Sequence, residues 1–419
     1  MTYFSRGSVT DNISTADKRA ALQGALRLTG KKLHKVLVLP PDHTRLNSNA
    51  GELTHLLYEM LAPTAQVDIM PTLGTHSPMT PAQLRMMFGD AIPFDRFIVH
   101  DWRKGVRQVG TVPGKLIKEW SEGRVDYDVR VEVSTQLFAG YDLILSVGQL
   151  VPHEVVGIAN YTKNIMTGAG GADTINKSHF LGAAFGMERM MGRIDTPVRK
   201  LFNYGCEQFL GNLPILYVLT VMQKTDAGMA MRGLYIGDDD ATFTTGAKLS
   251  QQVNLDMLDA PLKKVLVYLD PHEFKSTWLG NKAIYRTRMA MADDGELTIL
   301  APGLKEFGED AEIDRLIRKY GYRGTPATLA AVKANPELAS NLSAAAHLIH
   351  GSSEGRFRIT YCPGPGMSAE AIRSVGFEAG NLKDYPVEGL KDGFNGEIFY
   401  ISNPALGLWA LKSQFTTSS

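Results

Sequence analysis

The sequence contains only two cysteines, Cys206 and Cys362, which lie far apart. They allow no CxxC pair and no disulfide framework, so a reducing compartment is expected. Long hydrophobic runs are also missing, since none approaches the roughly 18–20 residues that a membrane-spanning helix needs. The N-terminal stretch has no apolar core behind basic residues, which argues against a signal peptide. We therefore expect a cytoplasmic protein with no membrane partner.

An excess of either charge is absent as well. Lys plus Arg and Asp plus Glu both number 44, so the formal net charge is zero. Proteins that bind nucleic acids usually carry a basic excess, so no nucleic-acid partner is expected. The hydrophobic share of 44% and the charged share of 21% are those of an ordinary globular protein. A chain of 419 residues is too long for one ordinary core, which favours two domains.

Short β-branched runs alternate with helical patterns along the chain, which is typical of an α/β fold with mostly parallel sheets. The expected strands of the first half lie within residues 35–45, 66–80, 96–102, 141–154 and 214–224. A helix is expected from Pro81, with Thr80 as its N-cap. The second half repeats the pattern, with strands in KKVLVYLDPHEF, GELTILAPG, FRITYCPGPGMS and GEIFYISNP and amphipathic helices between them.

The composition changes near residues 251–261, where QQVNLDMLDAP separates the two sets of elements. We expect an N-terminal α/β domain of residues 1–258 and a C-terminal α/β domain of residues 261–400, with an active-site cleft between them. Residues 403–419 are apolar enough to pack as a final helix, and we expect them to return to the N-terminal domain.

Polar side chains follow the expected strands at their carboxyl ends. They are Asp42, Arg45, His76, His100, Asp101 and His153. In open α/β sheets this edge is where ligands bind, because loops and helix N-termini meet there. Polar residues without a shared function would fall at either edge. The sequence therefore predicts a functional site at the carboxyl edge.

His76 and His153 are the candidates for acid–base chemistry. An imidazole titrates near neutrality, so it can take up or release a proton at working pH. His76 lies in the LGTHSPMT loop, where it could instead hydrogen-bond the loop backbone. His153 directly follows its strand and precedes Glu154, which could orient its ring.

Lys163 lies in YTKN, just before the glycine-rich TGAGGADT. Its amine could contact a phosphate or attach covalently to a ligand, or it could be an ordinary solvated charge. Gly168, Gly170 and Gly171 would allow backbone N–H groups to approach an anion. The stretch is neither a P-loop nor a strand-anchored GxGxxG, which argues against a nucleoside triphosphate or NAD.

Arg45 suits a bidentate clamp on a carboxylate, although Asp42 and Arg45 could also form a structural pair within their turn. His179 follows Lys163 by sixteen residues and lacks the companions of a zinc site. If His179 binds a metal, the other ligands must come from elsewhere in space or from a cofactor.

Together these motifs resemble those of the nickel-pincer lactate racemase family. PDHTR is similar to the family's D-x-T-R loop, and LGTHSPMT is similar to its L-G-x-H loop. The intervals of ten residues from His153 to Lys163 and sixteen from Lys163 to His179 agree with its central signature. The resemblance covers most of the chain.

The resemblance implies a nickel-pincer nucleotide as cofactor, in which a pyridinium-3,5-bisthiocarboxylic acid mononucleotide holds nickel and is attached covalently to Lys163. His179 would be the protein's ligand to the nickel, with a ring carbon and two sulfurs of the cofactor in the other positions. A square-planar site of this kind suits Ni(II). The enzymes that synthesise the cofactor would be partners of this protein.

The resemblance also implies racemisation or epimerisation of a small 2-hydroxy carboxylic acid. His76 and His153 would stand on opposite faces of the substrate, and each could take the hydroxyl proton while the α-hydrogen leaves as hydride to the cofactor. Two bases are needed because a single base would tend to restore the starting configuration. Arg45 would hold the substrate carboxylate, and Asp42 would orient a neighbouring residue.

The chain departs from the family pattern on both sides of Lys163 and in its second half. It has IANYTKN where many members are glycine-rich, and MTGAGG where they have proline. The family's glutamine–lysine pair near the substrate is missing from STWLGNKAIYRTRM. Lys282 is the candidate for the lysine, Asn281 for the glutamine, and Trp278 could line the pocket. We therefore expect a 2-hydroxy acid other than lactate as substrate.

The sequence also allows other functions. The same fold could serve a binding or cofactor-carrier protein, or a non-redox metal enzyme that uses His76 and His153 without racemisation. An NAD-dependent dehydrogenase would share the polar strand ends. It would need a glycine fingerprint after the first strand, where this chain has PPDHTR.

Overall fold

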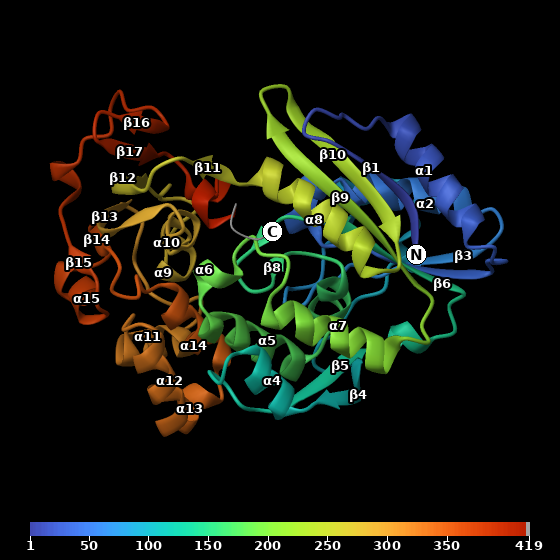
Figure 1. The fold of residues 1–419 in the computed structure, drawn as a ribbon, viewed down its shortest axis with the longest axis horizontal. Helices are drawn as coiled ribbons and strands as arrows, with labels where there is room; N and C mark the ends of the chain where they lie inside the picture. Colours follow the sequence, from blue (N-terminus) through green and yellow to red (C-terminus); the bar gives the residue numbers. More distant parts are fainter. Residues whose placement is uncertain (416–419) are drawn as a thin grey trace. The chain divides into compact units, whose positions relative to one another are not determined.

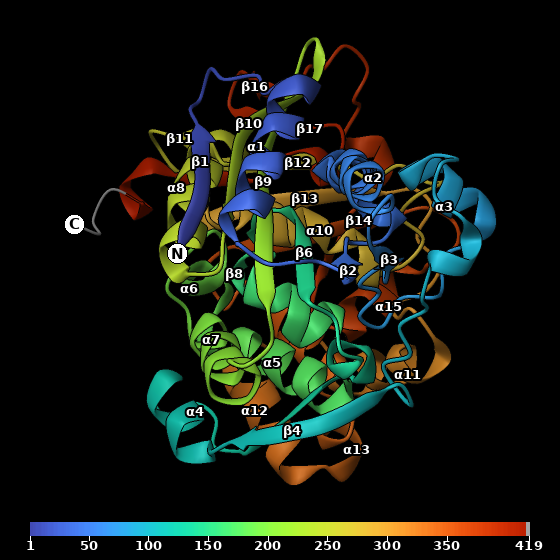
Figure 2. The same ribbon diagram turned by 90° about the vertical axis from the view of Figure 1, so that its right-hand side faces the viewer.

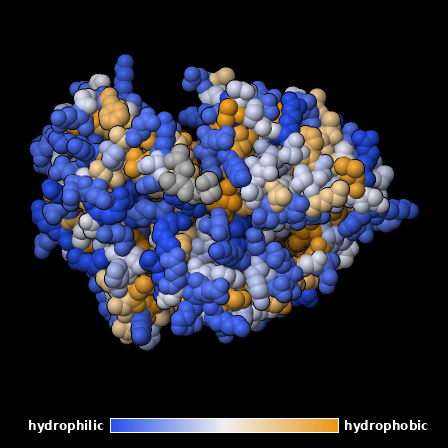
Figure 3. Space-filling model, viewed as in Figure 1, coloured by the Kyte–Doolittle hydropathy of each residue, from blue (hydrophilic) through white to orange (hydrophobic). Residues whose placement is uncertain are grey.

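The computed structural model describes residues 1–415, which form two compact units. The first unit consists of residues 1–178 and 190–254, and the second of residues 179–189 and the chain from residue 255 onward. Among the described residues, every helix is too short or too polar to cross a bilayer. Hydrophilic residues cover most of the face shown in Figure 3, with hydrophobic residues in small groups between them.

The first unit is built on a six-stranded sheet of order β1-β10-β9-β6-β2-β3. Its strands are β1 Thr2–Gly7, β10 Gly228–Gly237, β9 Ile215–Thr225, β6 Leu143–Gln149, β2 Lys35–Leu39 and β3 Gln66–Ile69. The four strands from β9 to β3 are parallel, whereas β10 and β1 add an antiparallel edge. The predicted strands in residues 35–45, 66–80, 141–154 and 214–224 are therefore confirmed.

Helices cover both faces of this sheet (Figure 1). Helices α1 Thr15–Leu28 and α2 Ala50–Leu61 pack on one face, where their leucines and alanines join a core with side chains such as Val38 and Val218. Helix α8 Asp240–Asn254 packs on the other face, against β9 and β10. Alternate residues of each strand point to opposite faces, so the central strands are apolar on both.

Helix α3 Pro81–Phe88, at the edge of the sheet beyond β3 in Figure 2, begins as predicted. Thr80 is its N-cap, and Gln83 completes a capping box. The strand expected in residues 96–102 is wrong. That segment holds a 3-10 turn, Phe94–Arg96, and a loop joined to the sheet by a single bridge between Ile69 and Phe97.

Residues 106–210 form the remaining elements of the first unit and the parts of two helices that belong to the second. Strands β4 Val106–Val112 and β5 Val129–Ser134 pair with each other, with helix α4 Gly114–Trp120 between them in sequence. The short strands β7 Pro152–His153 and β8 Gly157–Ile158 lead to a π-helical turn, Asn164–Gly168. Helices α5 Ala172–Phe185, α6 Met187–Met190 and α7 Pro197–Leu210 follow, and the unit boundary crosses α5 and α6.

The second unit has its own six-stranded sheet, of order β15-β14-β13-β12-β17-β16. Its strands are β15 Glu378–Ala379, β14 Arg358–Pro363, β13 Met291–Ala301, β12 Leu262–Tyr268, β17 Ile398–Ile401 and β16 Gly393–Asn395, all parallel except β16. Its further helices are α9 Thr277–Gly280, α10 Lys282–Thr287, α11 Ala311–Tyr320, α12 Thr325–Ala334, α13 Pro336–Ala339, α14 Leu342–His350 and α15 Ala369–Ser374. Two sheet-bearing α/β units with mostly parallel strands are as predicted.

The division between the units falls at residues 254 and 255, and residues 179–189 belong to the second unit, whereas they were expected from the sequence in the N-terminal domain. The C-terminal stretch differs from expectation, since strand β18 Trp409–Leu411 pairs with β11 Asp256–Leu258 inside the second unit. No α-helix forms over the described residues 403–415, because Pro404 and Gly407 interrupt the apolar run, and two 3-10 turns flank β18 instead. Residues 416–419 of the expected return lie outside the described residues.

Candidate active site

Three neighbouring parallel strands, β6, β2 and β3, end at the same edge of the first sheet. Asp42 and Arg45 follow β2, His76 follows β3, and His153 follows β6. Because parallel strands run in one direction, their carboxyl ends bring these segments together. The sheet topology therefore has the arrangement that the sequence predicted for these four residues.

Asn164, the residue after Lys163, forms hydrogen bonds with residues on or just after each of these three strands. Its buried amide nitrogen donates to the Leu39 carbonyl and to Ser146 Oγ, both at 3.0 Å. Its amide oxygen accepts a 2.7 Å hydrogen bond from Thr72 Oγ1. These partners lie on or just after β2, β6 and β3, so Lys163 is fixed beside their ends. Asn164 was not identified from the sequence. The one sequence feature that marks this residue is a polar side chain directly before two apolar residues.

Asp42 is buried and orients His76. The Nδ1–H of His76 donates to Asp42 Oδ2 at 2.5 Å, and the other carboxylate oxygen accepts from the Thr44 N–H at 3.0 Å. Burial alone would raise the pKa of Asp42, but the hydrogen bonds from His76 and Thr44 outweigh it and hold the pKa below its ordinary value. With Nδ1 engaged and a side chain 52% exposed, His76 presents Nε2 as the nitrogen that can accept a proton.

His153 has the opposite hydrogen-bond arrangement. Its Nδ1 accepts from the Val155 backbone N–H at 3.1 Å, so the proton of the neutral ring belongs on Nε2. Glu154 Oε2 lies 3.8 Å from the same nitrogen, close enough to stabilise the charged ring. The two histidines thus differ in tautomer and in their neighbouring carboxylate.

Lys163 has the properties of a nucleophilic amine. Within residues 1–415, its Nζ makes no hydrogen bond and no ion pair, and its side chain is partly buried. Burial lowers the pKa of Lys163 to about 8, helped by the charges of Arg45 and Arg199 and opposed by that of Glu154. A pKa near 8 leaves roughly a tenth of the amine neutral at pH 7, far more than for an ordinary lysine.

Arg45 is exposed. Within residues 1–415 its guanidinium donates only to Thr44, to the carbonyl at 3.4 Å and to Oγ1 at 3.3 Å. Among the described residues it forms no ion pair, so the Asp42–Arg45 pair considered from the sequence is not formed. A cation near Lys163 and without a carboxylate partner suits an anionic ligand.

The glycines after Lys163 serve close packing of the loop. A Cβ on Gly168 would lie 2.8 Å from Thr72 Cβ, on Gly170 2.0 Å from the Met166 carbonyl, and on Gly171 2.6 Å from Glu132 Cβ.

The backbone N–H groups of Gly170 and Gly171 already donate to protein carbonyls. The Glu132 carboxylate also accepts from the Asp173 N–H at the start of α5. The expected contact of Gly170 and Gly171 with an anion is therefore not supported, because protein groups already take up these donors.

His100 is buried and has a structural contact. Its Nε2–H donates to the Gly170 carbonyl at 3.0 Å, and burial lowers its pKa. Asp101 accepts from the N–H groups of Arg103 and Lys104 in the next turn. Neither residue follows a strand, so their expected place at the sheet edge is wrong.

His179 lies on α5, in the part of that helix that belongs to the second unit. Among residues 1–415, no group of three or more His, Cys, Asp or Glu side chains could hold a metal ion. A metal bound by His179 would need ligands from a cofactor. The unpartnered, partly neutral amine of Lys163 fits the covalent attachment of such a group.

The second unit holds the remaining candidates at the end of β12. The Trp278 ring on α9 packs against the His347 ring at a tilt of 33°, with centroids 4.4 Å apart, and Lys282 Nζ lies 5.6 Å from the centroid of the Phe274 ring. Asn281 is fully buried and accepts a hydrogen bond from Tyr361 at 2.7 Å. Asn281 therefore has a packing role and is not a stand-in for the missing glutamine.

Comparison with known proteins gives a family match over part of the chain and a shared fold over nearly all of it. The family model described as the lactate racemase N-terminal domain matches residues 8–190. The lactate racemase of Thermoanaerobacterium thermosaccharolyticum is 28% identical over 186 residues, which cover 41% of this chain and 40% of that enzyme. The match thus spans less than half of this relative.

Two solved structures share the fold over nearly the whole chain. A Thermotoga maritima protein has a TM-score of 0.80 at 22% identity, covering 97% of this chain and 100% of that one. The lactate racemase apoprotein of T. thermosaccharolyticum has a TM-score of 0.71 at 14% identity, covering 97% of this chain and 94% of that one.

Proposed function

We propose that the chain racemises or epimerises a 2-hydroxy acid, because residues 8–190 match the family model of the lactate racemase N-terminal domain. The observation that carries this proposal is the oriented Asp42–His76 pair at the sheet edge that also carries Lys163. An isomerase of this kind needs a base with a fixed ring nitrogen and an anchored group that accepts hydrogen from carbon.

His76 would take the proton of the substrate hydroxyl on Nε2. Its Nδ1–H bond to Asp42 supports this role, because the buried carboxylate stabilises the imidazolium that forms. His153 would act on the opposite face, where it returns a proton to the planar keto acid. Glu154 would stabilise the charged ring of His153.

Arg45 would hold the substrate carboxylate, since its guanidinium has no carboxylate partner within residues 1–415. In the second unit, Trp278 and Lys282 are proposed to contact the substrate. The missing glutamine favours a 2-hydroxy acid other than lactate. Trp278 would contact the side chain of this substrate.

The cofactor proposed is the nickel-pincer nucleotide, anchored at Lys163 with His179 as the protein's ligand to nickel. When bound, it would accept the α-hydrogen of the substrate as hydride and return it. Lys163 suits the anchor because its lowered pKa gives a neutral amine, the form that attacks a carboxyl-derived group. Partners would include the enzymes that build the cofactor.

The test is nickel content and intact mass of protein purified from cells that also make the cofactor. We expect near-stoichiometric nickel and an added mass in the wild type, and neither in Lys163→Ala. Lys177→Ala is the matched control and should load normally, because Lys177 is held in an ion pair with Asp173 on α5. A panel of 2-hydroxy acids, followed by chiral separation, then identifies the substrate.

An unmodified wild-type mass without nickel, alongside a loaded positive control, would contradict the proposal. A loaded protein that interconverts no enantiomers would favour the alternative of a binding or cofactor-carrier protein. Racemisation of an acid without added mass would point to a metal enzyme of another kind.

A further inference from the structure

Two of the three residues before Lys163 adopt an unusual backbone conformation. Asn160 has φ of 63° and Tyr161 has φ of 57°, both in the left-handed region. Residues with a Cβ avoid this region, and a bulky side chain such as that of tyrosine is rarely found there. Two such residues in succession persist only when surrounding contacts hold them. Something other than local preference therefore fixes the segment that carries Lys163.

Arg199, on α7, makes those contacts. One of its terminal nitrogens donates to the Asn160 carbonyl at 3.2 Å and to Thr162 Oγ1 at 2.8 Å. The other donates to the Ile158 carbonyl at 2.5 Å. The planar guanidinium thus binds three oxygens spread over residues 158–162, which only its fork of donors can reach at once.

The guanidinium is buried, and the Asp240 carboxylate acts on it only through its charge, without an ion pair among the described residues. Its side chain is 3% exposed, and among residues 1–415 it forms no ion pair. Its Cζ lies 4.3 Å from the ring centroid of Phe243 and 5.8 Å from that of Tyr161, so aromatic faces stabilise the charge. Burial lowers the pKa of Arg199 to about 10. A buried cation that binds mainly backbone oxygens is costly, which argues for a specific role.

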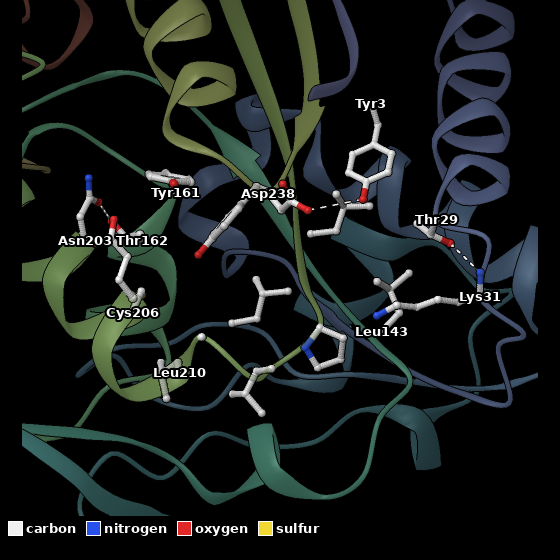
Figure 4. Close-up of a pocket in the computed structure, with 17 residues that line it drawn as sticks. Tyr3, Thr29, Lys31, Leu143, Tyr161, Thr162, Asn203, Cys206, Leu210 and Asp238 are labelled. Carbon is white, nitrogen blue, oxygen red and sulfur yellow. Dashed lines mark hydrogen bonds between the residues drawn. The ribbon is translucent and has the colours of Figure 1, made fainter. Parts of the chain in front are cut away.

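Aromatic packing holds one side chain of this segment. Tyr161 is buried, and its ring stacks on Phe243 with centroids 5.0 Å apart. Tyr161 and Thr162 line a cavity of about 320 Å³, together with Asn203 and Cys206 of α7. Figure 4 shows Thr162 joined to Asn203 at the edge of this cavity, with Tyr161 and Cys206 beside them. The aromatic contacts hold the Tyr161 ring, whereas Arg199 holds the backbone carbonyls of Ile158 and Asn160.

We propose that Arg199 is a positioning residue. Its hydrogen bonds hold the backbone of residues 158–162 in one conformation and thereby keep the amine of Lys163 in the position and surroundings that make it reactive. This inference rests on the proposed role of Lys163 as the cofactor anchor. The charged groups that act on Lys163 are Arg45, Glu154 and Arg199, and Arg199 is among those that lower its pKa. Loss of Arg199 removes a neighbouring cation and lets water reach the amine, and both changes raise the pKa of Lys163.

The experiment uses the full-length protein without cofactor. Acetic anhydride labelling of Lys163 across pH, read by peptide mass spectrometry, gives the apparent pKa, expected at about 8 in the wild type. Arg199→Gln should move it at least one unit toward the ordinary 10.5. Hydrogen exchange of the peptide that covers residues 158–164 should become at least tenfold faster. Arg199→Lys keeps the charge but not the three bonds, so exchange should still quicken while the pKa moves less.

Arg232→Gln is the matched control, because Arg232 also bonds a side chain and a backbone carbonyl in the first unit. Neither readout should change in it. If Arg199→Gln does not fold, Thr162→Val removes one of the three acceptors and should still speed exchange several-fold. A folded Arg199 or Thr162 variant with wild-type exchange and wild-type Lys163 pKa overturns the proposal. Cofactor loading of the wild type is measured separately, so its failure would contradict the proposed function and leave this result standing.

Discussion

At the scale of single residues, the Asp42–His76 pair determines which proton transfer is available at the carboxyl edge of the first sheet. The buried carboxylate fixes which nitrogen of His76 carries the proton, which an exposed loop histidine could not do alone. The expectation that Asp42 orients a neighbour fits this geometry. The catalytic use of His76 stays a proposal.

Asp42→Asn should reduce racemisation by roughly 100-fold or more, the scale of a general acid–base contribution. The amide cannot stabilise the imidazolium of His76, and its NH₂ group can favour the wrong tautomer. Chiral chromatography of the substrate found in the acid panel measures the rate, and intact mass checks that loading persists. Ring nitrogen NMR of His76 should show the tautomer change. Wild-type turnover in a loaded Asp42→Asn variant would contradict the assignment.

At the scale of elements, a buried charge network holds the segment that carries His179 within the second unit. Glu188 Oε1 accepts from Arg288 Nε at 2.8 Å and from an Arg356 nitrogen at 3.1 Å. Arg288 is 1% exposed, so its charge depends on this partner. Burial alone would raise the pKa of Glu188, but the two arginines hold it below its ordinary value.

Glu188→Ala should destabilise the second unit by about 3–5 kcal/mol, because it leaves a buried arginine without its carboxylate. Asp293→Ala is the control, since Asp293 pairs with the same Arg356 but is 78% exposed. That exposed pair should contribute less than about 1 kcal/mol. Urea unfolding followed by tryptophan fluorescence measures both. Equal losses in the two variants would show that burial of the network does not matter.

At the scale of the whole molecule, buried titratable groups set the response to acid. Burial, with the charge of His350, lowers the pKa of His347 to about 3. His347 stays neutral between hydrogen bonds with Tyr285 and Tyr322. Between pH 6.5 and 3 the unfolded chain binds a proton on this residue and the folded chain does not, so stability falls as the pH falls.

His347→Gln should therefore flatten the loss of stability between pH 6.5 and 4, where the wild type loses up to about 1.4 kcal/mol per pH unit from this group. Asp42 acts in a separate window. Its pKa is lowered, so its contribution is lost only as the pH falls below 3.8. Urea unfolding at pH 7, 6, 5 and 4 measures the slope. Parallel pH profiles for the variant and the wild type would rule out His347 as the cause.

Sequence patterns predicted the elements whose signal is local. The apolar runs gave β2, β6, β9 and β12, and the Thr80-Pro81 start gave α3 with its cap. The strand predicted over residues 96–102 is wrong because the apolar residues of this segment lie in a loop. The edge strands β1 and β10 were missed, since a sequence does not say which runs will pair antiparallel.

The sequence by itself determined two α/β units and placed Asp42, Arg45, His76 and His153 after strands, because strand periodicity and loop polarity are local properties. Only the tertiary structure decided which strands are neighbours, and therefore that these residues share one edge. The tertiary structure also decided that Asp42 accepts a hydrogen bond from His76. It likewise brought Arg199, 36 positions beyond Lys163, into hydrogen bonds with the backbone just before Lys163. Such contacts join residues distant in sequence, and burial gives them their strength, so no local pattern records them.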